Sequence, residues 1–182
     1  DAMLEAMEKM DKAVEHTQSQ FSTVRTGRAT PSLVERITIE YYGTQVPLQQ
    51  LASISVPEAR QLLIKPHDRG TLEAIEKSIR DSDLGVSPNN DGISIRISLP
   101  QLTEERRREY VKVVKHMAEE GRIAVRGARR DARQAMEAAE KGGEISADEL
   151  ERAEKELEKV THEHVEHIDA ALGRKEQELL EV

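Results

Sequence analysis

The arginines between residues 122 and 133 are the side chains of this sequence best suited to bind another molecule. Arg122, Arg126, Arg129 and Arg133 recur at spacings of four, three and four residues. An α-helix turns by about 100° per residue, so these four residues, the arginine stripe, would lie within roughly 60° of one another. Guanidinium groups at this spacing suit phosphate oxygens by charge and by bidentate hydrogen bonding. The sequence therefore predicts a surface that binds a polyanion, with RNA as the first candidate.

The rest of this helix bears on whether the stripe is a binding surface or a solvated face. Apolar residues expected to pack lie on nearly the opposite side: Tyr110, Val113, Met117, Ala124, Ala128 and Ala135. Asp131 is the only acid between the first and last arginine, whereas a helix surface built on its own ion pairs would alternate both signs. Gly121 and Gly127 each cost the helix about 1 kcal/mol relative to alanine, and close approach of a partner's backbone is one explanation. A merely solvated face stays open as the alternative.

Charge is segregated along a chain that is acidic as a whole. The 182 residues carry 27 Lys and Arg against 35 Asp and Glu, a net charge of −8. Residues 106–133 hold ten basic and four acidic side chains, whereas residues 144–182 hold five and thirteen. The net charge argues against general affinity for nucleic acid or anionic membrane, and the segregation favours a partner that meets one face. The chain has no cysteine and no long apolar run, so we expect a soluble protein without disulfides, a membrane-spanning segment or a thiolate metal site. The missing cysteines leave the redox compartment undetermined, and the cytoplasm is the default expectation.

The prolines divide the chain into two kinds of structure. All six lie between residues 31 and 100, and both flanks lack proline. Because proline obstructs helix interiors, residues 1–29 and 103–182 are expected to form one discontinuous helical domain and residues 30–102 an inserted domain. The two chain crossings, which comprise Ala29, Thr30, Pro31, Pro100, Gln101 and Leu102, are predicted to act as a hinge.

The inserted domain is expected to be a small mixed β/α/β unit. Short β-rich runs precede Tyr41, Pro57 and Pro66, and Ile93, Ile95, Ile97 and Leu99 alternate with polar residues as in a half-buried strand. Residues 71–84 have helical spacing, with Thr71 as the expected N-cap and Gly85 as the stop. Of the adjacent tyrosines at 41 and 42, one is expected in the core, and base stacking by the other is the less favoured alternative.

The flanks are expected to form three amphipathic helices that pack as an elongated bundle. The first contains Met7, Met10, Val14, Thr17, Phe21 and Val24 at helical spacing and should end near Gly27. The second should run from Thr103 to about Lys141, and the third should begin with a capping box formed by Ser146 and Glu149. A three-helix bundle buries its apolar faces internally, so a monomer is expected.

The sequence has no recognisable catalytic site. His162, His164 and His167 do not have the order of a zincin motif, and solvated or packing roles are favoured over a metal site. No glycine-rich loop followed by Lys-Ser/Thr is present, which argues against an intrinsic nucleotide triphosphatase. We therefore expect a protein that is not an enzyme and that requires no cofactor, no metal and no small-molecule substrate.

Several motifs resemble those of bacterial ribosome recycling factors, in the family's order and spacing. They are Arg25-Thr-Gly-Arg-Ala-Thr-Pro-Ser-Leu33, Glu40-Tyr-Tyr-Gly43, Pro47-Leu-Gln-Gln-Leu-Ala52, Leu102-Thr-Glu-Glu-Arg-Arg107 and Val125-Arg-Gly-Ala-Arg-Arg-Asp131. The departures are small: Thr30 stands where the family often has serine, and Gly127 where it often has asparagine. The resemblance covers nearly the whole chain.

The resemblance implies an α+β protein with L-shaped, tRNA-like architecture, in which a small β/α/β domain is inserted into a three-helix bundle. It implies a function in ribosome recycling: binding to the post-termination ribosome and, with elongation factor G and its GTP hydrolysis, separation of the subunits with release of messenger RNA and tRNA. Family positions place Arg126, Arg129 and Arg130 on large-subunit RNA, and the predicted contact set adds Arg122, Arg133, Arg25 and Arg28. For Arg25 and Arg28, bracing the hinge is the alternative to RNA contact.

Two other classes of function remain open from the residues alone. A helical adaptor would bind a protein through the bundle or the acidic third helix and would show no salt-sensitive RNA affinity. A general RNA-binding module would bind free single strands, but one Phe and three Tyr provide few stacking platforms.

Overall fold

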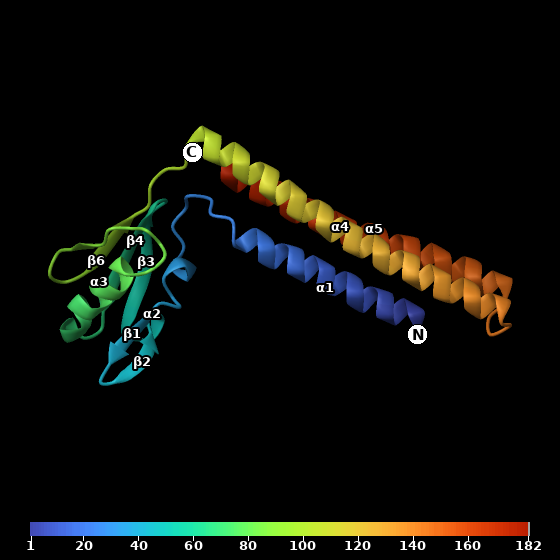
Figure 1. Cartoon of the computed structure of the whole chain (residues 1–182), viewed down its shortest axis with the longest axis horizontal. Helices are drawn as coiled ribbons and strands as arrows, with labels where there is room; N and C mark the ends of the chain where they lie inside the picture. The colour runs from blue at the N-terminus through green and yellow to red at the C-terminus, as the bar shows by residue number, and fades with distance from the viewer. Residues whose placement is uncertain (182) are drawn as a thin grey trace. The chain divides into compact units, whose positions relative to one another are not determined.

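The computed structural model describes residues 1–181, and the chain forms two compact units. The helical unit consists of Asp1–Thr26 and Thr103–Val182, and the sheet unit of Gly27–Leu102 (Figure 1). The polypeptide therefore passes between the units twice, at Thr26–Gly27 and at Leu102–Thr103. None of the helices in the described part of the chain has the length and apolarity that crossing a membrane requires.

Three long helices make up the helical unit: α1 (Ala2–Ser22), α4 (Glu104–Lys141) and α5 (Ala147–Leu180). Each pair of these helices is in contact. The Thr103 hydroxyl accepts a hydrogen bond from the Arg106 amide at 3.1 Å, and the Ser146–Glu149 capping box is complete, so both predicted helix starts are confirmed. The second helix ends at Lys141, as predicted.

The first helix ends earlier than predicted. It stops at Ser22, five residues before Gly27. The Thr23 side chain donates a hydrogen bond to the Gln20 carbonyl at 2.6 Å, and the Thr23 amide donates to the same oxygen at 3.1 Å. This local bonding competes with continued helix, as threonine does near helix ends. Of the expected packing residues, Met10, Thr17, Phe21 and Val24 are buried, whereas Met7 is exposed and Val14 is half-buried.

The sheet unit contains a hairpin and a four-stranded antiparallel sheet. Strands β1 (Thr38–Tyr41) and β2 (Thr44–Pro47) form the hairpin, and the sheet has the order β3-β4-β6-β5. Its strands are β3 (Ala52–Glu58), β4 (Gln61–Pro66), β5 (Asn89–Asn90) and β6 (Ile95–Ser98). Helical segments are η1 (Pro31–Leu33), α2 (Leu48–Leu51), η2 (Arg69–Thr71) and α3 (Leu72–Arg80).

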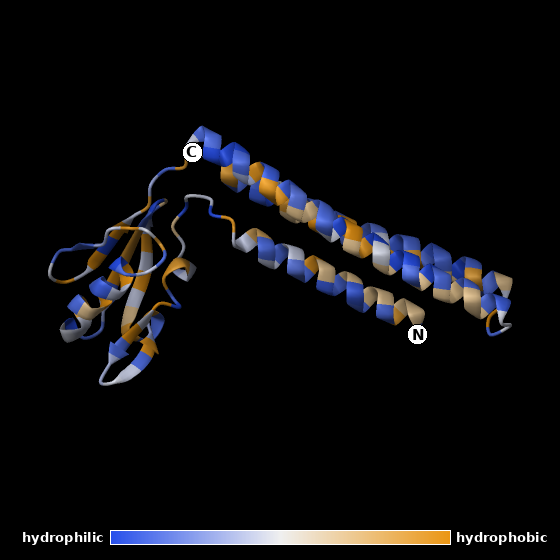
Figure 2. Cartoon of the chain, in the orientation of Figure 1, coloured by the Kyte–Doolittle hydropathy of each residue, from blue (hydrophilic) through white to orange (hydrophobic). Residues whose placement is uncertain are grey.

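One hydrophobic core serves this unit. Strands β4 and β6 alternate inward and outward residues, and α3 contributes Leu72, Ile75 and Ile79. In Figure 2 the strands of the four-stranded sheet carry many of the most hydrophobic residues of the unit. Together with the helical unit, this arrangement confirms the α+β prediction of a helix bundle with a small inserted sheet domain.

Several details of the inserted domain differ from the predictions. The β-rich run before Tyr41 forms a strand only from Thr38, and the fully buried Val34 follows a 3₁₀ turn. The elements β2, α2 and β5 were not predicted. Strand β3 continues through Pro57, at an irregularity in its pairing with β4, which is where an edge strand tolerates proline.

The strand predicted to begin at Ile93 begins at Ile95. Ile93 is 59% exposed, because the Asp91 carboxylate accepts hydrogen bonds from the Ile93 and Ser94 amides and holds these residues in a turn. Thr71 occupies the N-cap position, but its hydroxyl donates to the Asp68 carbonyl and makes no cap. The preceding 3₁₀ turn provides a partner for the first amide of α3, because the Leu72 amide donates to the Arg69 carbonyl.

The two adjacent tyrosines form the end of the β1–β2 hairpin. Tyr42 and Gly43 have φ values of 50° and 79°, as a two-residue turn of this hand requires. Tyr42 is 87% exposed and its ring meets that of Tyr41 edge-on at 4.4 Å between centroids. Tyr41 is only half-buried, so the prediction that one tyrosine belongs to the core is wrong.

Candidate nucleic-acid interface

The arginine stripe lies on α4, beside the buried face of the helix instead of opposite it. The buried residues are Val114, Ala118, Gly121, Val125, Ala128, Ala132 and Met136. At about 100° per residue, their mean direction is roughly a quarter of a turn from that of the stripe. Of the six residues expected to pack, only Ala128 is buried, and Val113 is 42% exposed. The prediction failed because α4 carries apolar residues on more than one side, and only its contacts with α1 and α5 determine which of them are buried.

Helix α5 places acidic side chains against the stripe. Asp169 contacts Arg122, Glu158 contacts Arg129 and Glu154 contacts Arg133. These acids, which we name the α5 carboxylates, were absent from the predicted site because they are distant in sequence. Their spacing did contain a signal, since Glu154, Glu158 and Asp169 fall within about 60° on one helix face. The stripe therefore has counter-charges, contrary to the inference drawn from the lone Asp131.

Arg122 is the most tightly held arginine of the stripe. Its Nε donates to Asp169 Oδ1 at 2.7 Å, its Nη2 lies 2.6 Å from the same oxygen, and its Nη1 donates to Glu119 Oε2 at 3.0 Å. Only 20% of its side chain is exposed. Partial burial alone would lower the pKa of Arg122, but the hydrogen bonds from Asp169 and Glu119 outweigh it and raise the pKa above its ordinary value. This guanidinium joins α4 to α5.

The other three arginines of the stripe are more exposed and more loosely paired. Arg126 Nη1 lies 3.6 Å from Glu119, and Arg129 Nη1 lies 3.4 Å from both oxygens of Glu158. Arg133 Nε lies 3.3 Å from Glu137 and 3.7 Å from Glu154. Exposed pairs at these distances contribute about 0 to 1 kcal/mol, so phosphate can displace the carboxylates at small cost.

Arg130 completes the site. It is exposed and, within residues 1–181, forms no ion pair. Together with Ile123, Arg126, Gly127, Arg129 and Arg133 it lines an open hollow of about 290 Å³ on α4. Four guanidiniums around one hollow on a rigid helix can contact several phosphates at once.

The two glycines of α4 have different explanations. A Cβ on Gly121 would overlap the Thr17 hydroxyl of α1 and lie 3.1 Å from Ile168 Cδ1 of α5, so Gly121 serves packing inside the bundle. The suggestion of a partner's backbone at this position is therefore wrong. A Cβ on Gly127 would meet only Arg130 Nη2, at 3.8 Å, so the bundle itself does not require glycine there.

Arg25 and Arg28 do not line this hollow. Both are exposed, and they belong to different units, Arg25 to the helical unit and Arg28 to the sheet unit.

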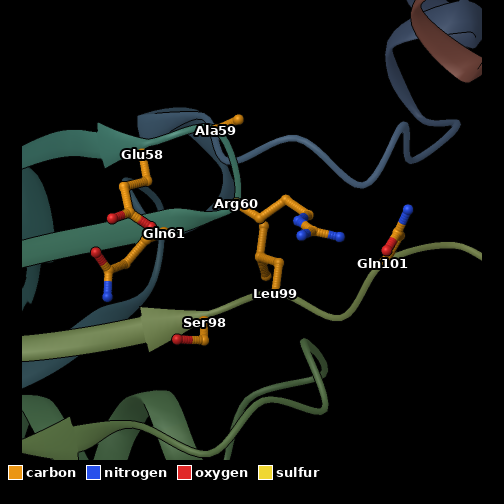
Figure 3. Close-up of a pocket in the computed structure, with 7 residues that line it drawn as sticks. All are labelled: Glu58, Ala59, Arg60, Gln61, Ser98, Leu99 and Gln101. Carbon is orange, nitrogen blue, oxygen red and sulfur yellow. The ribbon is translucent and has the colours of Figure 1, made fainter. Parts of the chain in front are cut away.

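All six predicted hinge residues lie within the sheet unit, and part of the segment is tied to the β3–β4 hairpin. The buried Ala29 donates its amide hydrogen to the Ala59 carbonyl at 2.8 Å, and the Leu99 amide donates to the Arg60 carbonyl at 2.8 Å. Beside these bonds is an open hollow of about 390 Å³ (Figure 3) lined by Glu58, Ala59, Arg60, Gln61, Ser98, Leu99 and Gln101.

The histidines of α5 make contacts within the helical unit. His164 bridges two helices, with Nδ1 2.7 Å from the Val160 carbonyl and Nε2 2.6 Å from Asp11 Oδ1 on α1. His162 lies 3.0 Å from Glu166. In the described part of the chain, no three acidic or histidine side chains are grouped so as to hold a metal ion.

Comparison with known proteins assigns the family. The sequence model described as ribosome recycling factor matches residues 17–180. The chain belongs to the ribosome recycling factor family. The ribosome-recycling factor of Acidothermus cellulolyticus is 55% identical over 182 residues, which cover all of this chain and 98% of the relative. That of Saccharopolyspora erythraea is 56% identical with the same coverage.

Solved structures of ribosome recycling factors resemble this fold. A solution structure of the ribosome recycling factor is 42% identical, covers 100% of this chain and 97% of its own, and has a TM-score of 0.79. A second, with 42% identity and a TM-score of 0.64 over 99% of this chain and 97% of its own, describes the Thermus thermophilus ribosome recycling factor and Escherichia coli elongation factor G bound to the Escherichia coli post-termination complex. The resemblance inferred from the sequence motifs is confirmed, and so is the function in ribosome recycling at this level.

Proposed function

We propose that this ribosome recycling factor docks its helical unit onto RNA of the large ribosomal subunit through Arg126, Arg129, Arg130 and Arg133. The observation that carries this proposal is the open hollow on α4 around which these four arginines gather, with Arg130 unpaired among residues 1–181. A long helix holds the guanidiniums at fixed spacing, so RNA that presents several phosphates in a matching arrangement binds best.

The remaining predicted contacts take different roles in this proposal. Arg122 braces α4 against α5 and contributes to RNA binding mainly by positioning its neighbours, because two carboxylates already hold its guanidinium. Arg25 and Arg28 flank the first crossing between the units, where they support the hinge or contact RNA near it.

Elongation factor G is the proposed protein partner. A related factor 42% identical to this chain has been described together with that GTPase on the post-termination complex. This chain contains no phosphate-binding loop of its own, so GTP hydrolysis belongs to the partner in the proposed reaction. The outcome is separation of the subunits in the cytoplasm with release of messenger RNA and tRNA, and the factor itself performs no catalysis.

The two chain crossings provide the proposed hinge. We place the moving points at Thr26–Gly27 and Leu102–Thr103, immediately beside the predicted residues Ala29 to Pro31 and Pro100 to Leu102. Gly27 has φ of +82°, a conformation that glycine adopts without strain. The Ala29 and Leu99 hydrogen bonds hold the adjoining segments to the sheet unit, which confines the flexible points to the crossings.

Co-sedimentation with isolated large ribosomal subunits across a salt series tests the docking proposal. Wild type should bind, and Arg130→Ala should lower affinity by about tenfold or more and reduce the salt slope by about one phosphate contact. Lys159→Ala on α5 is the matched control, because Lys159 is exposed, lies outside the hollow and carries the same charge. Equal binding by Arg130→Ala and wild type would place the RNA contact elsewhere.

A further inference from the structure

Three of the four arginines of the proposed RNA site pair with carboxylates of the same chain, and Arg130 has no ion pair within residues 1–181. Arg126 pairs with Glu119, Arg129 with Glu158, and Arg133 with both Glu137 and Glu154. Two of these acids, Glu119 and Glu137, belong to α4 itself, whereas Glu154 and Glu158 extend from α5. In the free protein three of the four guanidiniums are therefore already opposed by carboxylates of the same chain.

The α5 side of the stripe is lined mainly by acidic residues. A second hollow, of about 380 Å³, is formed by Arg133, Glu151, Glu154, Lys155, Leu157 and Glu158. Arg133 lines both this hollow and the one on α4, so the boundary between basic and acidic surface runs along the stripe. An RNA backbone that extends to the α5 side would lie beside carboxylates, and its phosphates would be repelled by their like charge.

The distances set how the carboxylates act. Asp169 holds Arg122 at 2.6 Å, whereas Glu158 and Glu154 lie 3.4 and 3.7 Å from their arginines. The side chains of Arg129 and Glu158 are 37% and 57% exposed, and those of Arg133 and Glu154 are 56% and 31% exposed. These contacts are loose enough to exchange for phosphate, yet each must be given up before the arginine can bind it.

We propose that Glu154 and Glu158 act as internal competitors of phosphate that make the arginine site selective for structured RNA. A structured RNA with several phosphates in fixed positions on the α4 side replaces all the carboxylates simultaneously. Because it is already ordered, it loses little conformational entropy on binding. A flexible single strand gains fewer simultaneous contacts, must lose conformational entropy and is repelled from the α5 side. Selectivity then comes from a built-in unfavourable interaction as well as from favourable contacts. This inference rests on the proposed docking of α4 to ribosomal RNA.

The decisive variant is the double substitution Glu154→Gln and Glu158→Gln. Its matched control is Glu156→Gln with Glu163→Gln, which removes the same charge from the opposite face of α5. Glu156 and Glu163 are exposed, and within the described chain neither forms an ion pair. Thermal unfolding of both proteins verifies that each remains folded.

Filter binding to unstructured polyuridylate RNA and co-sedimentation with large ribosomal subunits provide the two readouts. The Glu154→Gln, Glu158→Gln protein should bind polyuridylate about fivefold or more tightly than the control, with a smaller gain for subunits. Equal affinities of the two double variants for polyuridylate would overturn the inference, and so would an equal gain for both RNAs. A different result would contradict the proposed function, namely equal affinity of wild type and Arg130→Ala for large ribosomal subunits.

Discussion

Arg122 of α4 and Asp169 of α5 are joined by two short contacts to one carboxylate oxygen, from Nε at 2.7 Å and from Nη2 at 2.6 Å. Glu119 holds the third nitrogen of the same guanidinium at 3.0 Å. The first arginine of the stripe is thus part of the bundle's framework, whereas the later ones are available to a partner. This difference between neighbours of the same type predicts separate effects on stability and on binding.

Replacement of Arg122 should destabilise the helical unit more than it weakens RNA binding. Arg122→Ala removes both carboxylate contacts and should lower the free energy of unfolding by about 1 kcal/mol, measured by urea denaturation. Arg122→Lys should recover only part of this loss, because an ammonium lacks the planar fork that reaches two carboxylates. Subunit binding that falls as steeply for Arg122→Ala as for Arg130→Ala would show that Arg122 contacts RNA directly.

The two glycines of α4 should respond in opposite directions to the same substitution. Gly121→Ala places a methyl group against Thr17 and Ile168, so we expect a net loss of about 1 to 3 kcal/mol despite the better helix propensity of alanine. Gly127→Ala has open space and should raise stability by up to about 1 kcal/mol. Urea denaturation of both variants measures the difference, and a stabilising Gly121→Ala would contradict the packing explanation.

The turn before β6 should loosen at low pH. Hydrogen bonds from the Ser94 and Ile93 amides, followed by the Ser94 hydroxyl, lower the pKa of Asp91 below its ordinary value. The folded-state pKa is therefore the lower one, so the stabilisation is complete above the unfolded pKa of about 3.9 and is lost as the pH falls through the folded-state value. The amide resonances of these two residues should report the titration in NMR spectra.

Two substitutions check the assignment of that titration. Asp91→Asn should remove the pH dependence and leave the two amides more weakly protected from exchange at neutral pH. Asp83 is exposed and has no ion pair in residues 1–181, so Asp83→Asn should leave the pH dependence of the two amides unchanged. Titration that persists in Asp91→Asn would assign it to another group.

The proposed hinge predicts a broad distribution of distances between the two units. Because the chain has no cysteine, spin labels can be introduced at Lys112→Cys on α4 and Lys77→Cys on α3, both exposed positions. Pulsed electron paramagnetic resonance should give a broad distribution of spin-label distances for this pair. The control pair, Lys112→Cys and Lys159→Cys within the helical unit, should give a narrow one. One narrow distribution for the first pair would rule out a flexible hinge in the free protein.

The features that could be predicted without the structure are those encoded by neighbouring residues. The helix starts at Thr103 and Ser146 follow from caps whose partners lie three residues away, and the division into helices and insert follows from proline. The arginine stripe follows from helical periodicity, and the family motifs are local strings. Helical periodicity also places the α5 carboxylates on one face of α5, but only the structure shows that this face meets the stripe.

The roles of these residues in packing, ion pairing and binding depend on contacts between helices that are distant in sequence. Arg122 and Asp169 are 47 residues apart, and Gly121 meets Thr17 from another helix, so no local pattern distinguishes the braced arginine from the available ones or the packed glycine from the open one. The end of α1 at Ser22 and the exposure of Ile93 likewise depend on side-chain hydrogen bonds that compete with regular structure. Periodicity identifies a face of a helix, but the neighbouring helices determine whether that face is packed, paired or free to bind.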